Sequence, residues 1–103
     1  MARIGLLIDT DIFIDFLNRG TFGNILRGVD HDIYYSVVTE KELRTKPGLS
    51  DAERISIRRV LERYRRIPLT HAISARYTDV RRRCPSLAKE DALIAATALE
   101  KRL

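Results

Sequence analysis

The sequence predicts an α/β fold in which a short parallel sheet is flanked by helices. Two runs of apolar and β-branched residues, Ile4 to Ile8 and Ile33 to Val38, have the composition of strands. Helical periodicity separates these runs and continues after the second one. Strands that alternate with helices are typical of βαβ units, whose strands lie parallel. The 103 residues match the length of one small domain, so we expect a single domain over residues 1–103 with one core.

The amino-terminal region predicts one strand and two helices. The run from Ile4 to Ile8 is nearly continuous in apolar residues, which is typical of a strand buried on both faces. Asp9 would then lie at the carboxyl end of this strand. From Asp11 the apolar residues recur at helical spacing until Gly20, where a helix can end. A second short helix is expected from Phe22 to Leu26.

Two capping-box patterns predict the helices of the middle region. Thr39 is followed three residues later by Glu42, and Ser50 is followed in the same way by Glu53. The first helix would end at the Lys-Pro-Gly sequence between the two patterns, because proline and glycine both interrupt helices. The second helix would continue to about Arg66.

The carboxyl-terminal region predicts a third strand and two more helices. Residues 67–69 have strand character, although Pro68 would confine such a strand to the edge of the sheet. The helices are expected from Ala72 to about Arg82 and from Ser86 to about Arg102, with a break at Cys84-Pro85 between them.

The formal net charge is +5 and the sequence pI is near 9.8, mostly because of arginine. Such a charge favours polyanions through attraction to phosphate. Two arginine clusters either track RNA phosphates or form solvated helix ends that complement the negative end of the helix dipole. Both interpretations stay open for these residues, which are Arg63, Arg65, Arg66, Arg81, Arg82 and Arg83.

The composition excludes several other classes of protein. The lone cysteine, Cys84, has no partner for an internal disulfide and no metal-site spacing. The apolar run before Asp9 is too short for a signal peptide or a membrane span. We therefore expect a cytoplasmic protein that does not associate with a membrane. No constellation of residues supports a serine or cysteine nucleophile.

Three carboxylates next to apolar segments are the strongest indication of chemistry. Asp91 shares a helix face with apolar residues such as Ile94 and Ala98, so we expect it to point inward. Each acid also has a structural explanation, since Asp9 or Asp11 can cap a helix, Glu42 completes a capping box, and a buried Asp91 can pair with an arginine. If they converge, their mutual repulsion requires a divalent cation. Mg²⁺ or Mn²⁺ suits such an all-oxygen site and can activate water towards a phosphodiester.

Three segments that contain these acids resemble the motifs of one known family. In the first segment, Leu6 to Leu17, an apolar strand is followed by Asp-Thr-Asp and an apolar helix. The second, Ser36 to Leu43, places Glu42 in a helix after a strand. The third, Asp91 to Leu99, has the sequence Asp-Ala-Leu-Ile-Ala-Ala-Thr-Ala-Leu. Together, and in this order, they resemble the PIN domains of VapC-like toxin ribonucleases, the toxins of VapBC toxin-antitoxin pairs.

The resemblance implies a three-layer PIN-like fold and a metal-dependent endoribonuclease. Asp9, Glu42 and Asp91 would be the catalytic acids and would bind Mg²⁺ or Mn²⁺. Asp11 would be an accessory residue, and Thr10 or Ser36 would orient the site by hydrogen bonding. Water activated by the metal would hydrolyse RNA. A cognate antitoxin protein would bind the helical groove and block the metal site with a basic side chain.

The chain also departs from the family pattern. Family members usually continue past the third motif with a further strand and a fourth acidic position, so this chain resembles a fold truncated at its carboxyl terminus. Glu90 is a poor substitute for that acid, because it projects about 100° away from Asp91 around the helix. The first strand would be left with an open edge, from which we expect a homodimer or a partner-bound form. The alternative function is a catalytically reduced PIN module that binds RNA or a protein partner.

Overall fold

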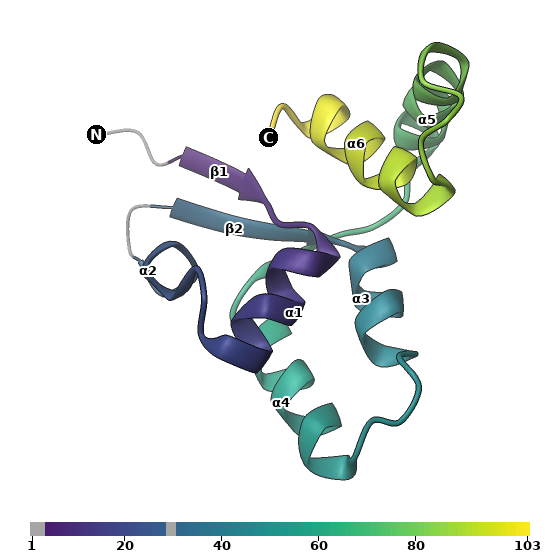
Figure 1. The fold of residues 1–103 in the computed structure, drawn as a ribbon. Coiled ribbons are helices and arrows are strands. Elements are labelled where there is room, and N and C mark those ends of the chain that lie inside the picture. Colours follow the sequence, from purple (N-terminus) through teal and green to yellow (C-terminus); the bar gives the residue numbers. More distant parts are fainter. Residues whose placement is uncertain (1–3, 29–30) are drawn as a thin grey trace.

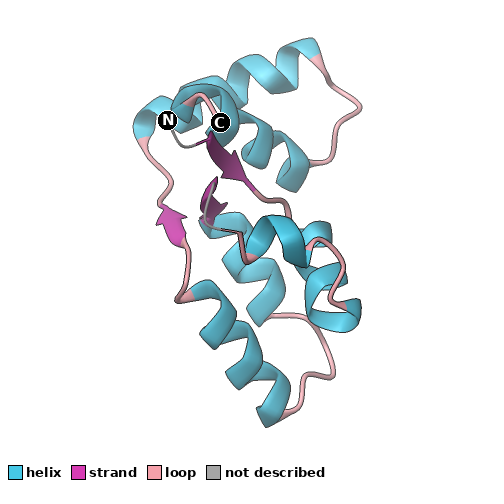
Figure 2. Ribbon diagram, turned by 90° about the vertical axis from the view of Figure 1, so that its left-hand side faces the viewer, coloured by secondary structure: helices cyan, strands magenta, loops and turns pink. Residues whose placement is uncertain are grey.

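The computed structural model describes residues 4–28 and 31–103 and forms three layers. The middle layer is a parallel sheet in the order β1-β2-β3, with strands β1 (Ile4–Leu7), β2 (His31–Ser36) and β3 (Arg65–Ile67). Figures 1 and 2 show helices on both sides of this sheet. The predicted α/β architecture, with helices on both sides of a short parallel sheet, is therefore confirmed.

The helices alternate with the strands along the chain. One face of the sheet is covered by α1 (Thr10–Arg19), α2 (Gly23–Leu26), α3 (Val37–Arg44) and α4 (Asp51–Leu61), and the other by α5 (His71–Arg83) and α6 (Lys89–Lys101). Asp9 caps α1 by accepting a hydrogen bond from the Ile12 backbone N–H at 3.1 Å. Gly20 ends α1 at a positive φ of 70°, which glycine adopts without strain. The capping box of Ser50 and Glu53 is present as predicted at the start of α4.

The prediction for the start of α3 was wrong. The helix begins at Val37, and the strand before it ends at Ser36 rather than at Val38. The Ser36 hydroxyl accepts from the backbone N–H of Thr39 at 3.2 Å, so Ser36 is the N-cap. This cap places two β-branched valines in the first turn of a helix, against their strand propensity. The Thr39 and Glu42 capping box does not exist, and Glu42 is free of that structural role.

The helix predicted to reach Arg66 also ends early. α4 stops at Leu61, and the chain turns so that Arg65 and Arg66 belong to β3. In this turn the Tyr64 hydroxyl donates to the backbone carbonyl of Leu26 at 2.8 Å, which ties β3 to the end of α2. The third strand precedes Pro68 instead of containing it, and it lies at the sheet edge as expected. The last helix begins at Lys89 rather than at Ser86.

The described residues form two hydrophobic clusters, one on each face of the sheet, where a single core was expected. Neighbouring residues on β2 point to opposite faces, so Ile33 and Tyr35 enter one cluster and Tyr34 packs against the other. The buried members of the larger cluster, here called the first core, are Phe13, Phe16, Leu26, Ile33, Tyr35, Leu43, Ile57 and Leu61. Those of the second core are Ile67, Ile73, Val80, Ala92 and Ala96.

Two smaller observations concern the apolar character of the helices and the single cysteine. Across residues 4–28 and 31–103, no helix combines the length and apolar character needed to cross a membrane. Cys84 is exposed and free, in line with its lack of a disulfide partner in the sequence.

Candidate functional site

The carboxyl ends of β1 and β2 bring together several of the residues selected from the sequence. Asp9 follows β1 and caps α1, whereas Ser36 ends β2 and caps α3. Both helices therefore begin at the same edge of the sheet (Figure 1). Ligands of parallel α/β sheets usually bind at this edge. The expected position of Asp9 and Ser36 is confirmed.

A chain of hydrogen bonds connects α1 to α3 at this edge. The Thr10 hydroxyl lies 2.8 Å from Glu42 Oε1 and donates to it. The Thr39 hydroxyl lies 3.2 Å from that of Thr10 and 3.4 Å from that of Ser36. Glu42 is only half-buried, but Thr39 and Ser36 are 0% and 2% exposed. The three hydroxyl groups therefore fix the direction of the Glu42 carboxylate from inside the protein.

Thr39 belongs to this network, and the sequence did not predict that role for it. It was taken for a helix cap, yet it lies inside α3 and faces Thr10. Thr39 and Glu42 are three residues apart, which places them on one helix face. With Ser36 as the helix N-cap, this spacing alone indicates that Thr39 and Glu42 can contribute to one site.

The two acids on either side of Thr10 in the sequence, Asp9 and Asp11, have different structural roles. Asp9 is exposed and uses Oδ1 to cap α1, so its structural role is confirmed. An ionised carboxylate has further lone pairs, so the cap does not exclude a second ligand. Asp11 is exposed in the first turn of α1, where its charge complements the positive end of the helix dipole.

Asp91 does not point inward, and that prediction was wrong. Its side chain is exposed in the first turn of α6. The buried ridge of this helix carries Ala92 and Ala96, both 0% exposed. The apolar residues that share a face with Asp91 are only partly buried, as Ile94 is. Because α6 is apolar on nearly every side, the sequence pattern could not determine which side packs.

A cavity between α3 and α6 contains Glu90 instead of Asp91. It has a volume of about 360 Å³, and Glu42 and Glu90 line it together with Lys41 and Lys89. The rotation of α6 that exposes Asp91 brings the preceding residue to this cavity. Glu90, which the sequence analysis dismissed, therefore shares a cavity with Glu42.

The carboxylates at this edge are chemically suitable ligands for Mg²⁺ or Mn²⁺, which prefer oxygen ligands. Within the described part of the chain, however, no three His, Cys, Asp or Glu side chains are grouped so that they could hold a metal ion. Asp9, Glu42 and Asp91 are thus not assembled as a three-ligand set, and their metal role stays a prediction.

The arginine clusters divide into paired and unpaired residues. Arg66 forms an ion pair with Glu40 at 3.2 Å, and Arg81 donates to the backbone carbonyl of Leu87 in the turn after α5. Arg82 and Arg83 are exposed in the last turn of α5, as expected of charges that solvate a helix end. Arg63 and Arg65 follow α4 and line a separate cavity.

These features define a small three-layer α/β protein whose sheet carries Asp9 and a hydrogen-bonded glutamate at its carboxyl edge. A sequence model of the PIN domain matches residues 6–103, and the chain belongs to the PIN-domain family. No curated protein matched the sequence at a significant level.

Two solved structures are similar to this chain over most of its length. One is a chain of VapBC2 from Rickettsia felis bound to a DNA fragment from its promoter, with a TM-score of 0.85, 18% identity, and coverage of 96% of this chain and 83% of that chain. The other belongs to a toxin-antitoxin complex from Klebsiella pneumoniae, with a TM-score of 0.79, 28% identity, and coverage of 94% of this chain and 80% of that chain. At 18% identity the first likeness shows the fold alone.

Proposed function

We propose that this PIN-domain protein is an endoribonuclease toxin of a toxin-antitoxin pair that acts in the cytoplasm. The observation that carries the proposal is the hydrogen bond from Thr10 to Glu42 at the carboxyl edge of the sheet. It ties a carboxylate to the residue that follows Asp9, within a chain that the PIN-domain family matches over residues 6–103. The likeness to a chain of a toxin-antitoxin complex at 28% identity supports the toxin role.

The catalytic acids of the proposal are Asp9, Glu42 and Asp91, and the cofactor is Mg²⁺ or Mn²⁺. Mg²⁺ commonly takes only one or two protein carboxylates, with water and phosphate oxygens completing its shell. A site completed by the RNA substrate is thus consistent with acids that do not form a three-ligand group on their own. When bound, the metal would lower the pKa of water and stabilise charge on the phosphate.

The residues of the chain itself would orient this chemistry. Thr10 directs Glu42, and Thr39 with Ser36 supports Thr10 from the buried side. Because these hydrogen bonds set the direction of the carboxylate, they would preorganise it for the reaction. Asp11 is an accessory acid at the same edge.

The test measures Mn²⁺ binding by calorimetry and RNA cleavage in the same samples. Wild type is compared with Asp9→Asn and Asp91→Asn, and the matched control is Asp79→Asn, which removes an exposed charge from α5. We expect both site variants to lose cleavage and to bind Mn²⁺ more weakly, whereas the control keeps both. If manganese-loaded wild type and Asp9→Asn cleave structured RNA equally poorly, the enzyme proposal fails.

One observation favours a second function, a PIN module that binds RNA or a protein without cleaving. Asp91 is exposed and does not line the cavity that contains Glu42. A binding module predicts salt-dependent RNA association with no metal-dependent cleavage. The same calorimetry separates the two functions, because a module shows unchanged weak metal binding in Asp91→Asn and no product in any sample. Arg63, Arg65, Arg82 and Arg83, which form no ion pair among the described residues, are the arginines whose loss should then weaken binding of RNA.

The proposed antitoxin would occupy the groove between α1, α3 and α4. A cavity of about 200 Å³ lies there, lined on its apolar side by Ile14, Leu17, Leu43 and Ile57. An amphipathic helix buries its apolar face in such grooves. We expect Leu17→Asp to abolish co-purification with the antitoxin, and Leu69→Asp, which changes an exposed leucine elsewhere, to preserve it. Equal co-purification of both variants would contradict this assignment.

Self-association through β1 is the last part of the proposal. β1 pairs with β2 on one side, and in residues 4–28 and 31–103 no strand pairs on its other side. Ile4 on this strand is 59% exposed, and Leu99 on α6 is 55% exposed. An open edge with exposed apolar residues is commonly covered by another chain. Light scattering should show a dimer at micromolar concentration, and a monodisperse monomer would count against it.

A further inference from the structure

A cavity at the opposite edge of the sheet has the chemistry of an anion site. It has a volume of about 540 Å³ and is lined by the end of α2, the turn after α4 and the first residues of β2 and β3. Three arginines line it, namely Arg27, Arg63 and Arg65, together with one acid, Asp32. The cavity is therefore basic, whereas the carboxyl edge carries the acids of the proposed nuclease site.

The two edges are far apart on the scale of a small domain. β2 begins at His31, beside the cavity, and ends at Ser36, in the hydrogen-bonded network. At about 3.3 Å for each residue, its six residues separate the two places by about 17 Å. The basic cavity is a separate location from the acidic edge.

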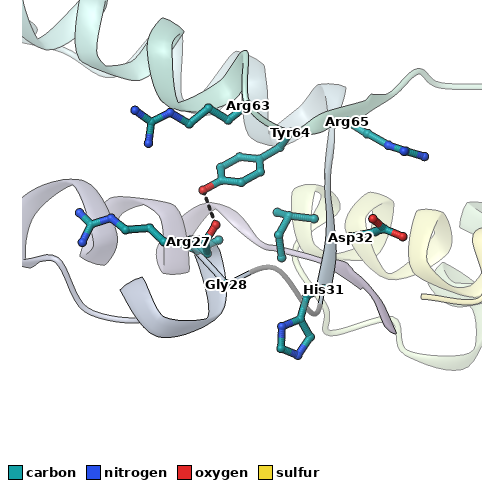
Figure 3. Close-up of a pocket in the computed structure, with 9 residues that line it drawn as sticks. Arg27, Gly28, His31, Asp32, Arg63, Tyr64 and Arg65 are labelled. Carbon is teal, nitrogen blue, oxygen red and sulfur yellow. Dashed lines mark hydrogen bonds between the residues drawn. The ribbon is translucent and has the colours of Figure 1, made fainter. Parts of the chain in front are cut away.

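Arg27 and Arg63 face the same side of the cavity. Figure 3 shows their side chains extending in one direction on either side of Tyr64, while Arg65 and Asp32 extend in the other. Burial raises the pKa of the Tyr64 phenol above its usual 10.0, and the positive charges of Arg63 and Arg27 oppose this rise. Both guanidinium groups are thus close enough to act on the same hydroxyl.

The Tyr64 hydroxyl is already engaged, which leaves the guanidinium groups as the donors of this site. Tyr64 donates its proton to the Leu26 carbonyl at 2.8 Å. That bond holds the turn containing Arg63 against the end of the helix that precedes Arg27. The Arg27 guanidinium also lies 5.0 Å from the centre of the Phe16 ring, which limits its freedom. Arg27 and Arg63 thus line one cavity on either side of a tyrosine whose position is fixed by a hydrogen bond.

Arg27 and Arg63 differ from some other arginines of the described residues in forming no ion pair. Other arginines of the chain form ion pairs, as Arg66 does with Glu40 and Arg76 with Glu100. Among the described residues, Arg27 and Arg63 form none. Two neighbouring cations without a counter-charge repel each other, and a bound anion removes that repulsion.

We propose that Arg27 and Arg63 form a phosphate-binding site at the amino edge of the sheet, apart from the proposed nuclease centre. The planar guanidinium group donates two parallel hydrogen bonds to phosphate oxygens, which makes arginine well suited to this ligand. The phosphate belongs either to the backbone of an RNA strand or to a small phosphorylated molecule. Arg65 adds positive charge from the other side of the cavity.

The experiment uses the full chain with Asp9→Asn and without metal, so that the result does not depend on the nuclease proposal. Inorganic phosphate is titrated and followed by phosphorus NMR, and a labelled oligoribonucleotide without terminal phosphate is titrated by fluorescence anisotropy. The variants are Arg27→Gln, Arg63→Gln and their combination. Arg59→Gln is the control, because it removes an exposed charge from α4 outside the cavity.

Each cavity substitution should weaken phosphate binding about tenfold, since a hydrogen bond to a charged group contributes about 1.4 kcal/mol or more. Arg59→Gln should bind phosphate like the parent. If RNA occupies the site, phosphate displaces the RNA. The slope of the logarithm of the RNA affinity against the logarithm of the salt concentration then decreases in magnitude by about 0.7 for each arginine removed. If RNA affinity is unchanged while phosphate binding weakens, the ligand is a small phosphorylated molecule. Phosphate binding that is the same in the double variant and the parent would overturn the proposal.

Discussion

Replacing Thr10 with valine tests the hydrogen bond that orients Glu42. Valine keeps the shape of threonine and removes the hydroxyl that donates to Glu42 Oε1 at 2.8 Å. A hydrogen bond to a charged group contributes about 1.5 to 3 kcal/mol to stability. Glu42 is half-buried, so water can replace part of the interaction, and we expect a loss near the lower limit, about 1.5 kcal/mol. In a domain of this size such a loss lowers Tm by about 6 to 12 °C.

Urea unfolding of a double-mutant cycle measures this interaction separately from other effects of the substitution. Thr10→Val combined with Glu42→Ala should show a coupling free energy of about 1 kcal/mol. The control cycle uses Glu40→Ala, because Glu40 lies on the same helix but pairs with Arg66 instead. Thr10→Val and Glu40→Ala should be additive within about 0.5 kcal/mol. A coupling near zero with Glu42, or an equal coupling with Glu40, would refute the proposed orientation of the carboxylate.

Three further predictions concern stability. Phe13, which is 0% exposed, packs against two tyrosine rings, so Phe13→Ala should cost about 3 to 5 kcal/mol and weaken the near-ultraviolet circular dichroism of the tyrosines. A hydrogen bond from the Ser50 backbone lowers the pKa of Glu53 below its usual 4.5. The ionised carboxylate therefore stabilises the fold above pH 4.5, and this stabilisation is lost as the pH falls through the lowered pKa. Glu53→Gln should remove this part of the acid sensitivity of the urea midpoint. Arg81→Met removes the donor to the Leu87 carbonyl, so hydrogen exchange should accelerate in residues 84–88 and not in the first core.

The layered fold was predictable because local signals and burial agreed. The apolar run that precedes Asp9 forms β1, and the Ser50 capping box starts α4 as its spacing indicates. The start of α3 was not predictable from propensity, since Val37 and Val38 favour strands. Their helical conformation depends on the Ser36 cap and on packing of the helix against the rest of the fold.

The candidate site was predictable in part for a related reason. Asp9 lies just after β1, and Glu42 lies in the helix that follows β2, so the topology places both near one edge of the sheet. Asp91 depends on the rotation of α6, and a helix rich in alanine has no single apolar stripe that sets its rotation. Whether Asp91 or Glu90 faces α3 is decided by packing against α5, which leaves no periodic signal in the sequence of α6.

The separation of the two cores by the sheet has a consequence for the acidic edge. Glu42 belongs to a helix packed on the first core, whereas Glu90 and Asp91 belong to a helix packed on the second. Ala92 and Ala96 are fully buried on α6, so this helix packs on the second core through small side chains. The cavity between α3 and α6 therefore lies between two halves of the molecule, each of which has its own core. Any ligand that bridges it stabilises both halves at once and makes their unfolding more cooperative.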